Sequence, residues 1–180
     1  LGQPVTAVFS VGAGENTQAA EQRMGQLGAD QIIALRHDLL ADYQGQLASR
    51  ALADLINEKK PNIVLIAATT TGRDVAPRVA VRTGAGLASG GLELNLSGNG
   101  QLETTQSCFA EALLSSVVTP TARPQMALVR PKAYAKPEPN PSRPTAPVES
   151  LTPALSSEMA KSRLVEVKAP ESTGRKKLEE

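Results

Sequence analysis

Up to Gly84, the chain alternates between short apolar runs and longer segments whose apolar residues recur with helical spacing. The short runs are rich in β-branched residues and predict strands at residues 5–11, 31–35 and 62–68. The longer segments predict helices at residues 16–27, 42–59 and 75–83. Asn16 can cap the first helix, and Gly28 and Gly84 are suited to ending the first and third helices.

Residues 62–68 form the most apolar run of the chain, and polar residues do not interrupt it. Such a run is typical of a strand covered on both faces, as in a parallel sheet with helices on either side. Three successive strand–helix units predict right-handed crossovers between parallel strands. The predicted fold class is therefore α/β, with a Rossmann-like parallel sheet flanked by helices. In such sheets, ligands bind at the carboxyl ends of the strands.

After Gly84 the composition changes, and glycines become frequent. The tetrapeptide Ser97-Gly98-Asn99-Gly100 lies between two short apolar segments and predicts a hairpin turn. Further strands are predicted at residues 113–118, 126–129 and 164–167. We therefore expect an antiparallel hairpin region added to the parallel sheet.

Most of the prolines lie between Pro120 and Pro153. Because proline donates no amide hydrogen bond, residues 131–147 are predicted to form an extended surface excursion. The charged final segment has no apolar partner, and we interpret residues 169–180 as a connector toward a further, FAD-binding domain. Residues 1–168 then form one domain. Its first residues are typical of the middle of a domain, so we expect an opening strand and helix ahead of them.

Residues 67–78 carry the most chemistry, because hydroxyls, a glycine and a helix start meet where the third strand ends. A helix N-terminus carries partial positive charge, and an arginine adds a fork of donors. One interpretation is a cofactor-binding anion cradle, formed by Thr70, Thr71, Gly72 and Arg73. The other is structural: Thr71 or Asp74 caps the helix, and the arginines pair with acids at a subunit surface. The segment lacks the lysine and the spacing of a P-loop.

Charge and composition exclude several classes of function. With 19 Lys and Arg against 18 Asp and Glu, the net charge of +1 offers no footprint for nucleic acid. The lone Cys108 excludes a disulfide within the chain, and we interpret it as an inert thiol. The lone His37 is interpreted as a surface or hydrogen-bonded histidine. Since no acid, base and nucleophile assemble, we predict that the chain is not an enzyme.

No apolar run approaches the roughly 18–20 residues that span a bilayer. We also expect no signal peptide at the start of the chain. We therefore predict no membrane span and a cytoplasmic location.

An ordered set of segments is shared with one known family. Residues 66–80 read IAATTTGRDVAPRVA, residues 84–87 read GAGL, and residues 123–131 read RPQMALVRP. Gly28-Ala29-Asp30 before a strand and Asp42-Tyr43 before a helix complete the set. In this order they resemble the alpha subunit of bacterial electron transfer flavoproteins over nearly the whole chain.

The resemblance implies an N-terminal domain with an adenine-nucleotide-hydrolase-like, Rossmann-related sheet, in a heterodimer of alpha and beta subunits. Such proteins carry electrons from flavin dehydrogenases, for example those of acyl-CoA, to an acceptor. FAD is then expected in the complete protein with its main ligands beyond Glu180, and AMP or a second FAD in the beta partner. The resemblance implies a docking role for this domain, for which we select Arg73, Asp74, Arg78, Arg123 and Arg130.

Two other classes are considered. A free-standing adenine-nucleotide-binding module akin to universal stress proteins would use residues 69–73 as a phosphate cradle. An amidating or pyrophosphatase enzyme on the same sheet is disfavoured by the single histidine and the missing P-loop.

The chain also departs from the flavoprotein pattern at Gln106, where an arginine is usual, and at Ala110-Glu111-Ala112, where a glycine pair is usual. A backbone position that needs glycine would be strained there.

Overall fold

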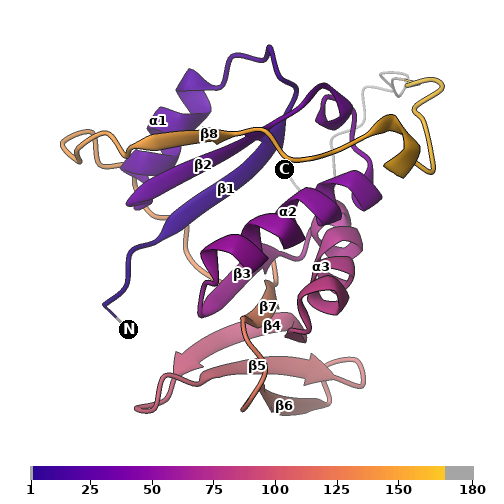
Figure 1. The fold of residues 1–180 in the computed structure, drawn as a ribbon. Coiled ribbons are helices and arrows are strands. Elements are labelled where there is room, and N and C mark those ends of the chain that lie inside the picture. Colours follow the sequence, from indigo (N-terminus) through magenta and orange to yellow (C-terminus); the bar gives the residue numbers. More distant parts are fainter. Residues whose placement is uncertain (1, 169–180) are drawn as a thin grey trace, which may run out of the picture.

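The computed structural model describes residues 2–168 and arranges their strands in two sheets (Figure 1). The first sheet has the order β1-β2-β8, and all of its strands are parallel. Its strands are β1 (Thr6–Val11), β2 (Gln31–Arg36) and β8 (Val148–Leu151). Helix α1 (Gln18–Gln26) connects β1 to β2 and ends before Gly28, whose φ of +122° suits glycine.

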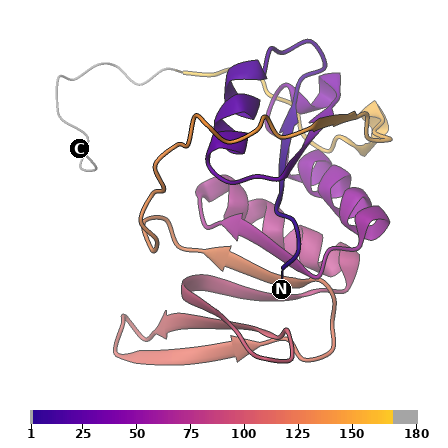
Figure 2. The same ribbon diagram turned by 90° about the vertical axis from the view of Figure 1, so that its left-hand side faces the viewer.

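The second sheet has the order β3-β7-β4-β5-β6. Its strands are β3 (Ile63–Ala67), β4 (Gly86–Leu96), β5 (Leu102–Cys108), β6 (Leu113–Val118) and β7 (Gln125–Val129). The pairs β3–β7 and β7–β4 are parallel, whereas β4–β5 and β5–β6 are antiparallel hairpins (Figure 2). The α/β fold class with an added antiparallel region is therefore confirmed.

One helix packs against both sheets. Helix α2 (Gly45–Lys59) contacts β2 through a cluster that includes Leu47, Ala51 and Leu55. Other residues of α2 join α3 (Thr70–Thr83) and the second sheet in a separate cluster around Ile56 and Val79. The hydrophobic core thus continues from one sheet to the other beneath α2. Two short 3-10 helices, η1 (Asp38–Leu40) and η2 (Ser157–Met159), complete the elements.

Several predicted boundaries are wrong. Helix α3 begins at Thr70, five residues before the predicted start, and α2 begins at Gly45 rather than at residue 42. Residues 164–167 do not form a strand, whereas β8 was not predicted. The expectation that residues 62–68 are covered on both faces is also wrong, since Leu65 is 53% exposed.

The proline-rich residues 131–147 contain no helix or strand. They are attached to the first sheet through Arg143, which donates to the carboxylate of Asp30 over 2.6 Å and to the carbonyl of Gly28 over 3.1 Å. The predicted connector at residues 169–180 lies outside the described residues. Among residues 2–168, no helix combines the length and the apolar character needed to cross a membrane.

Candidate functional site at the carboxyl edge of the strands

The passage from β3 into α3 is a capped helix start. The Thr69 hydroxyl accepts a hydrogen bond from the Gly72 amide over 3.1 Å, so the predicted caps Thr71 and Asp74 are wrong. A Cβ built on Gly72 would lie 1.9 Å from the carbonyl oxygen of Ala67. Gly72 is therefore needed because the first turn of α3 packs directly onto the end of β3.

These contacts fit a phosphate cradle poorly. The amide of Gly72 is already bonded to Thr69, and Arg73 Nε donates to the carbonyl of Ala68 over 3.1 Å. Thr69, Thr70, Thr71 and Arg73 are exposed at the helix start, whereas Gly72 is buried. The contacts favour the structural interpretation of this corner, and the cofactor-binding role of Thr70 to Arg73 stays a prediction.

Three side chains from two helix starts form a polar network. Tyr43 Oη donates to Asp74 Oδ2 over 2.7 Å, and Arg78 Nε donates to Asp74 Oδ1 over 3.0 Å. The carboxylate reaches this position because residue 45 is a glycine: a Cβ there would lie 1.9 Å from Asp74 Oδ2. The network therefore joins the segment before α2 to the first turns of α3.

The network shifts two pKa values. Partial burial, followed by the hydrogen bond to Asp74 and its negative charge, raises the pKa of Tyr43 from 10.0 to about 12. The hydrogen bond from Tyr43, followed by that from Arg78, lowers the pKa of Asp74. The stabilisation tied to the Tyr43 proton is thus complete below its ordinary pKa and is lost as pH rises through about 12. The stabilisation tied to ionised Asp74 is present above its ordinary pKa and is lost as pH falls through the lowered value.

Replacing Asp74 is expected to return the Tyr43 pKa toward its ordinary value. In Asp74→Asn the negative charge is gone, so the pKa falls below 12 but stays above 10.0, because the burial persists. Phenolate absorbance measured against pH in a Tyr134→Phe background reports Tyr43 alone. An unchanged titration curve in Asp74→Asn would show that Asp74 does not stabilise the protonated side chain of Tyr43.

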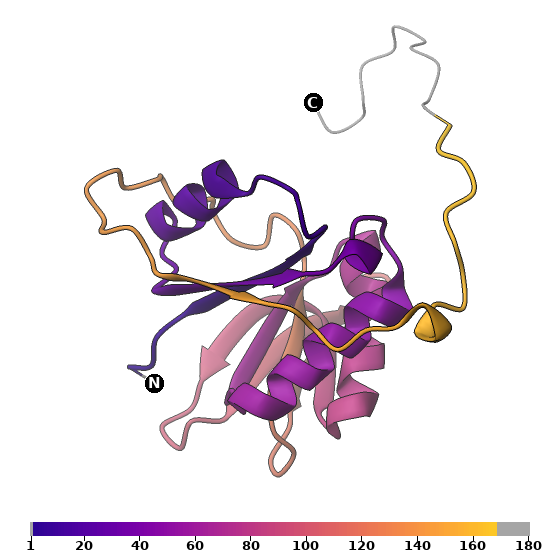
Figure 3. The same cartoon turned by 45° about the horizontal axis from the view of Figure 1, so that its top comes forward.

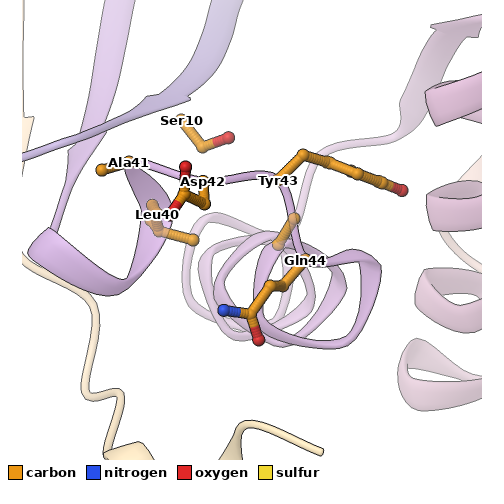
Figure 4. A pocket seen from close by; sticks show the side chains of 7 residues that line it. Ser10, Leu40, Ala41, Asp42, Tyr43 and Gln44 are labelled. Atoms are coloured by element: carbon orange, nitrogen blue, oxygen red, sulfur yellow. The ribbon is translucent and has the colours of Figure 1, made fainter. Parts of the chain in front are cut away.

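A hollow of about 210 Å³ lies next to this network at the end of β1. It is lined by Ser10 and by residues 40–44, which lead into α2 (Figure 4). Figure 4 shows Tyr43 pointing away from Ser10 and toward α3. The Gln44 Oε1 atom is buried and has no hydrogen-bond partner within residues 2–168. No motif in the sequence pointed to Ser10 or Gln44; the available signal was the position of Ser10 at the carboxyl end of β1 and of Gln44 after β2, where ligands bind in such sheets.

The residues predicted to dock a partner fall in two places. Arg73, Asp74 and Arg78 share the start of α3. Arg130 follows the end of β7, which pairs with β3 at Ala67↔Val129, so it lies at the same edge of the sheet. Arg123 precedes β7 at the opposite edge, and its guanidinium donates to the carbonyl of Ala122 over 2.9 Å.

Arg130 also fixes the turn between β5 and β6. Its guanidinium donates to Glu111 over 2.9 Å. Phe109, Ala110 and Glu111 have positive φ values of 51°, 53° and 71°, which glycine adopts more readily. The strain expected at this departure from the family pattern is therefore present at Ala110 and Glu111.

The remaining chemical candidates have structural contacts. His37 Nδ1 accepts a hydrogen bond from the Leu39 amide over 3.1 Å and caps η1. Cys108 Sγ lies 3.3 Å from the Ser115 hydroxyl. In residues 2–168, no group of three or more His, Cys, Asp or Glu side chains is arranged to hold a metal ion.

The fold and this edge define the class of the protein as a Rossmann-like α/β domain with an antiparallel extension. Comparison with known families gives a more specific result: the Electron transfer flavoprotein domain matches residues 1–156. The chain belongs to this family, as the ordered motifs predicted.

Relatives in the family cover much of this chain. Protein FixB of Azorhizobium caulinodans is 40% identical over 124 residues, which is 69% of this chain and 34% of that protein. The electron transfer flavoprotein subunit alpha of Clostridium acetobutylicum is 36% identical over 137 residues, or 76% of this chain and 40% of that subunit. Protein FixB of Rhizobium meliloti is 38% identical over 135 residues, or 75% and 38%. The chain therefore spans about two fifths or less of the length of these relatives.

Proposed function

We propose that this chain is the N-terminal domain of an electron transfer flavoprotein alpha subunit and that it docks a beta-type subunit. The observation that carries the proposal is the family match over residues 1–156, together with alpha-subunit relatives. The complete protein would carry electrons from flavin dehydrogenases to an acceptor. In this role the chain is part of an electron carrier rather than a catalyst, and its proposed location is the cytoplasm.

We place the main FAD ligands of the complete protein outside residues 1–180. The helix start at Thr69 to Arg73 supports this placement, because its capping bonds already use the amide of Gly72 and the Nε of Arg73. When bound, a flavin accepts and donates the electrons, and the surrounding protein sets its potential and its access to partners. The same capping bonds do not favour the free-standing nucleotide-binding module.

The docking surface we propose is the edge that carries Arg73, Asp74, Arg78 and Arg130. The Arg78–Asp74 pair is exposed and holds both charges at the start of α3. Arg130 adds a further pair with Glu111 at the same edge. Charged groups around an interface fix its orientation and speed the encounter of the partners. Arg123, the remaining residue proposed for docking, lies at the other edge of the sheet and outside this surface.

Charge reversal at Arg78 is expected to weaken the complex at least about tenfold, because Asp74 loses its partner and a like charge enters the surface. The measurement is the dissociation constant between the full-length alpha-type polypeptide and the beta-type subunit of the same organism, at low salt. Arg50→Glu is the matched control, since Arg50 and Asp54 form the same kind of exposed pair, four residues apart, over 2.9 Å on α2.

Two outcomes distinguish an error in the proposed docking function from an error in the proposed docking surface. If the unsubstituted polypeptide forms no complex, the docking function is wrong. If the complex forms, and Arg78→Glu and Arg50→Glu weaken it equally, the surface is wrong while the function stands.

A further inference from the structure

The segment that follows β8 passes over α2, and we call its residues 152–161 the strap. Leu155 and Met159 of the strap pack against the cluster that includes Leu47 of α2. In Figure 3 the segment runs from β8 across α2 and reaches η2 beside the helices. Because apolar packing fixes the strap on α2, the polar side chains of η2 and its neighbours are held next to that helix.

A hollow of about 330 Å³ lies between the strap, the first turns of α2 and the last turn of α3. Its volume is at the lower end of the range of about 300–1,000 Å³ that is typical of small-molecule sites. The polar side chains that line it come from all three elements: Gln46, Arg50, Arg82, Ser156, Glu158 and Lys161. The hollow therefore combines the size of a ligand site with a cluster of positive charge.

These positive charges are only partly neutralised within residues 2–168. Arg50 Nε donates to Asp54 Oδ2 over 2.9 Å, and the terminal nitrogens of Arg50 have no partner there. Arg82 forms no ion pair in that part of the chain. Lys161 Nζ donates only to the carbonyl of Glu158, over 3.4 Å. Even with the carboxylates of Asp54 and Glu158 counted, three positive charges stand against two negative ones.

A hydroxyl donor at the hollow is also unused. Ser156 directly precedes η2, yet its side chain makes no capping hydrogen bond. The start of α3 differs in this respect, because Arg73 Nε is bonded to the carbonyl of Ala68 and Arg78 Nε to Asp74. Side-chain donors are therefore more available for a ligand at the hollow than at the start of α3.

We propose that this hollow binds the diphosphate group of a small anionic ligand. Guanidinium groups bind phosphate oxygens in pairs, and hydrogen bonds between charged groups are about twice as strong as neutral ones. Arg50 and Arg82 face the hollow from different helices, so two separate donor forks are offered. A diphosphate has enough oxygens for both forks and for Lys161, whereas a single fork uses both oxygens of a carboxylate. Its negative charge also offsets the repulsion among the three cations.

The test is isothermal titration calorimetry of the full-length polypeptide with inorganic diphosphate at low salt, without any beta-type subunit. We expect a dissociation constant below about 1 mM. Arg82→Gln should raise this constant at least about tenfold, because charge-assisted hydrogen bonds to the anion are lost. Arg23→Gln is the matched control, since Arg23 is also an exposed arginine in the last turn of a helix and does not line the hollow. It should change the constant less than about twofold.

Absence of binding to the unsubstituted polypeptide would overturn the proposal. Equal weakening by Arg82→Gln and Arg23→Gln would also overturn it, because the anion would then respond to the overall charge and not to the hollow. A parallel titration with uridine diphosphate distinguishes the two sources of a diphosphate group. Tighter binding than that of inorganic diphosphate supports an ester as the ligand, and weaker binding supports the free anion. None of these outcomes depends on the docking function.

Discussion

Gly72→Ala is expected to destabilise the domain by about 3 kcal/mol or more, at the upper end of the cost of overpacking a core. The added Cβ would meet the Ala67 carbonyl oxygen at 1.9 Å and Ile66 Cγ2 at 3.1 Å. The first contact is with backbone, so no side-chain rotation relieves it. Either β3 or the first turn of α3 must move, and the Thr69 cap is then lost. Urea denaturation of the purified protein measures the change.

Helix propensity alone predicts that Gly72→Ala stabilises the domain. A loss of stability therefore identifies the steric contact as the cause. Alanine in a helix is favoured over glycine by about 1 kcal/mol. Gly98→Ala is the control, since a Cβ there meets nothing within 4 Å. It should leave stability unchanged or raise it by about 0.4–1 kcal/mol. A Gly72→Ala protein as stable as Gly98→Ala would show that α3 does not pack onto the end of β3.

The same glycine explains why the start of α3 was predicted too late. Three threonines followed by Gly72 are poor helix formers, so local preference places this stretch in a loop. The helix nevertheless begins at Thr70, because the Thr69 cap and the close approach of Gly72 to Ala67 stabilise its first turn. Local sequence shows the residue types that permit this contact, but not the contact itself.

The two errors among the late strands have a related cause. Residues 164–167 contain three apolar side chains, two of them β-branched, as a strand would, but among residues 2–168 they pair with no strand. Residues 148–151 contain two polar positions and give a weak signal, yet β8 forms because the free edge of β2 is available. Lys59 of α2 adds an ion pair to Glu149 over 3.0 Å. In both cases, pairing with a strand far away in the sequence decides whether the residues form a strand.

The candidate site was predictable in position but not in detail. The end of an apolar strand followed by hydroxyls and a glycine indicated the corner at Thr69 to Asp74. The partner of Asp74, however, is Tyr43, which precedes it by 31 residues. Their meeting depends on how α2 and α3 pack, and on the absence of a side chain at Gly45. Neither condition is visible in a local motif.

The buried Gln125 gives a second large expected effect. Its side chain is 1% exposed at the start of β7. Gln125 Oε1 accepts from the Leu102 amide over 2.7 Å, and Nε2 donates to the Gly100 carbonyl over 3.1 Å. The glutamine therefore fastens the β4–β5 turn to β7. This contact gives a physical reason for the glutamine of the Arg-Pro-Gln-Met-Ala segment.

Gln125→Ala is expected to destabilise the domain by about 3–4 kcal/mol, because a cavity forms and the Leu102 amide is left buried without its partner. Gln125→Met separates the two causes: it fills the space, so only the cost of the unpaired groups remains, about 1–3 kcal/mol. Gln18→Ala, at an exposed position on α1, controls for the loss of a glutamine. Guanidinium denaturation gives all three values. If Gln125→Met unfolds at the same midpoint as the unsubstituted protein, the hydrogen bonds to Leu102 and Gly100 do not stabilise the sheet, and the turn is held by apolar packing alone.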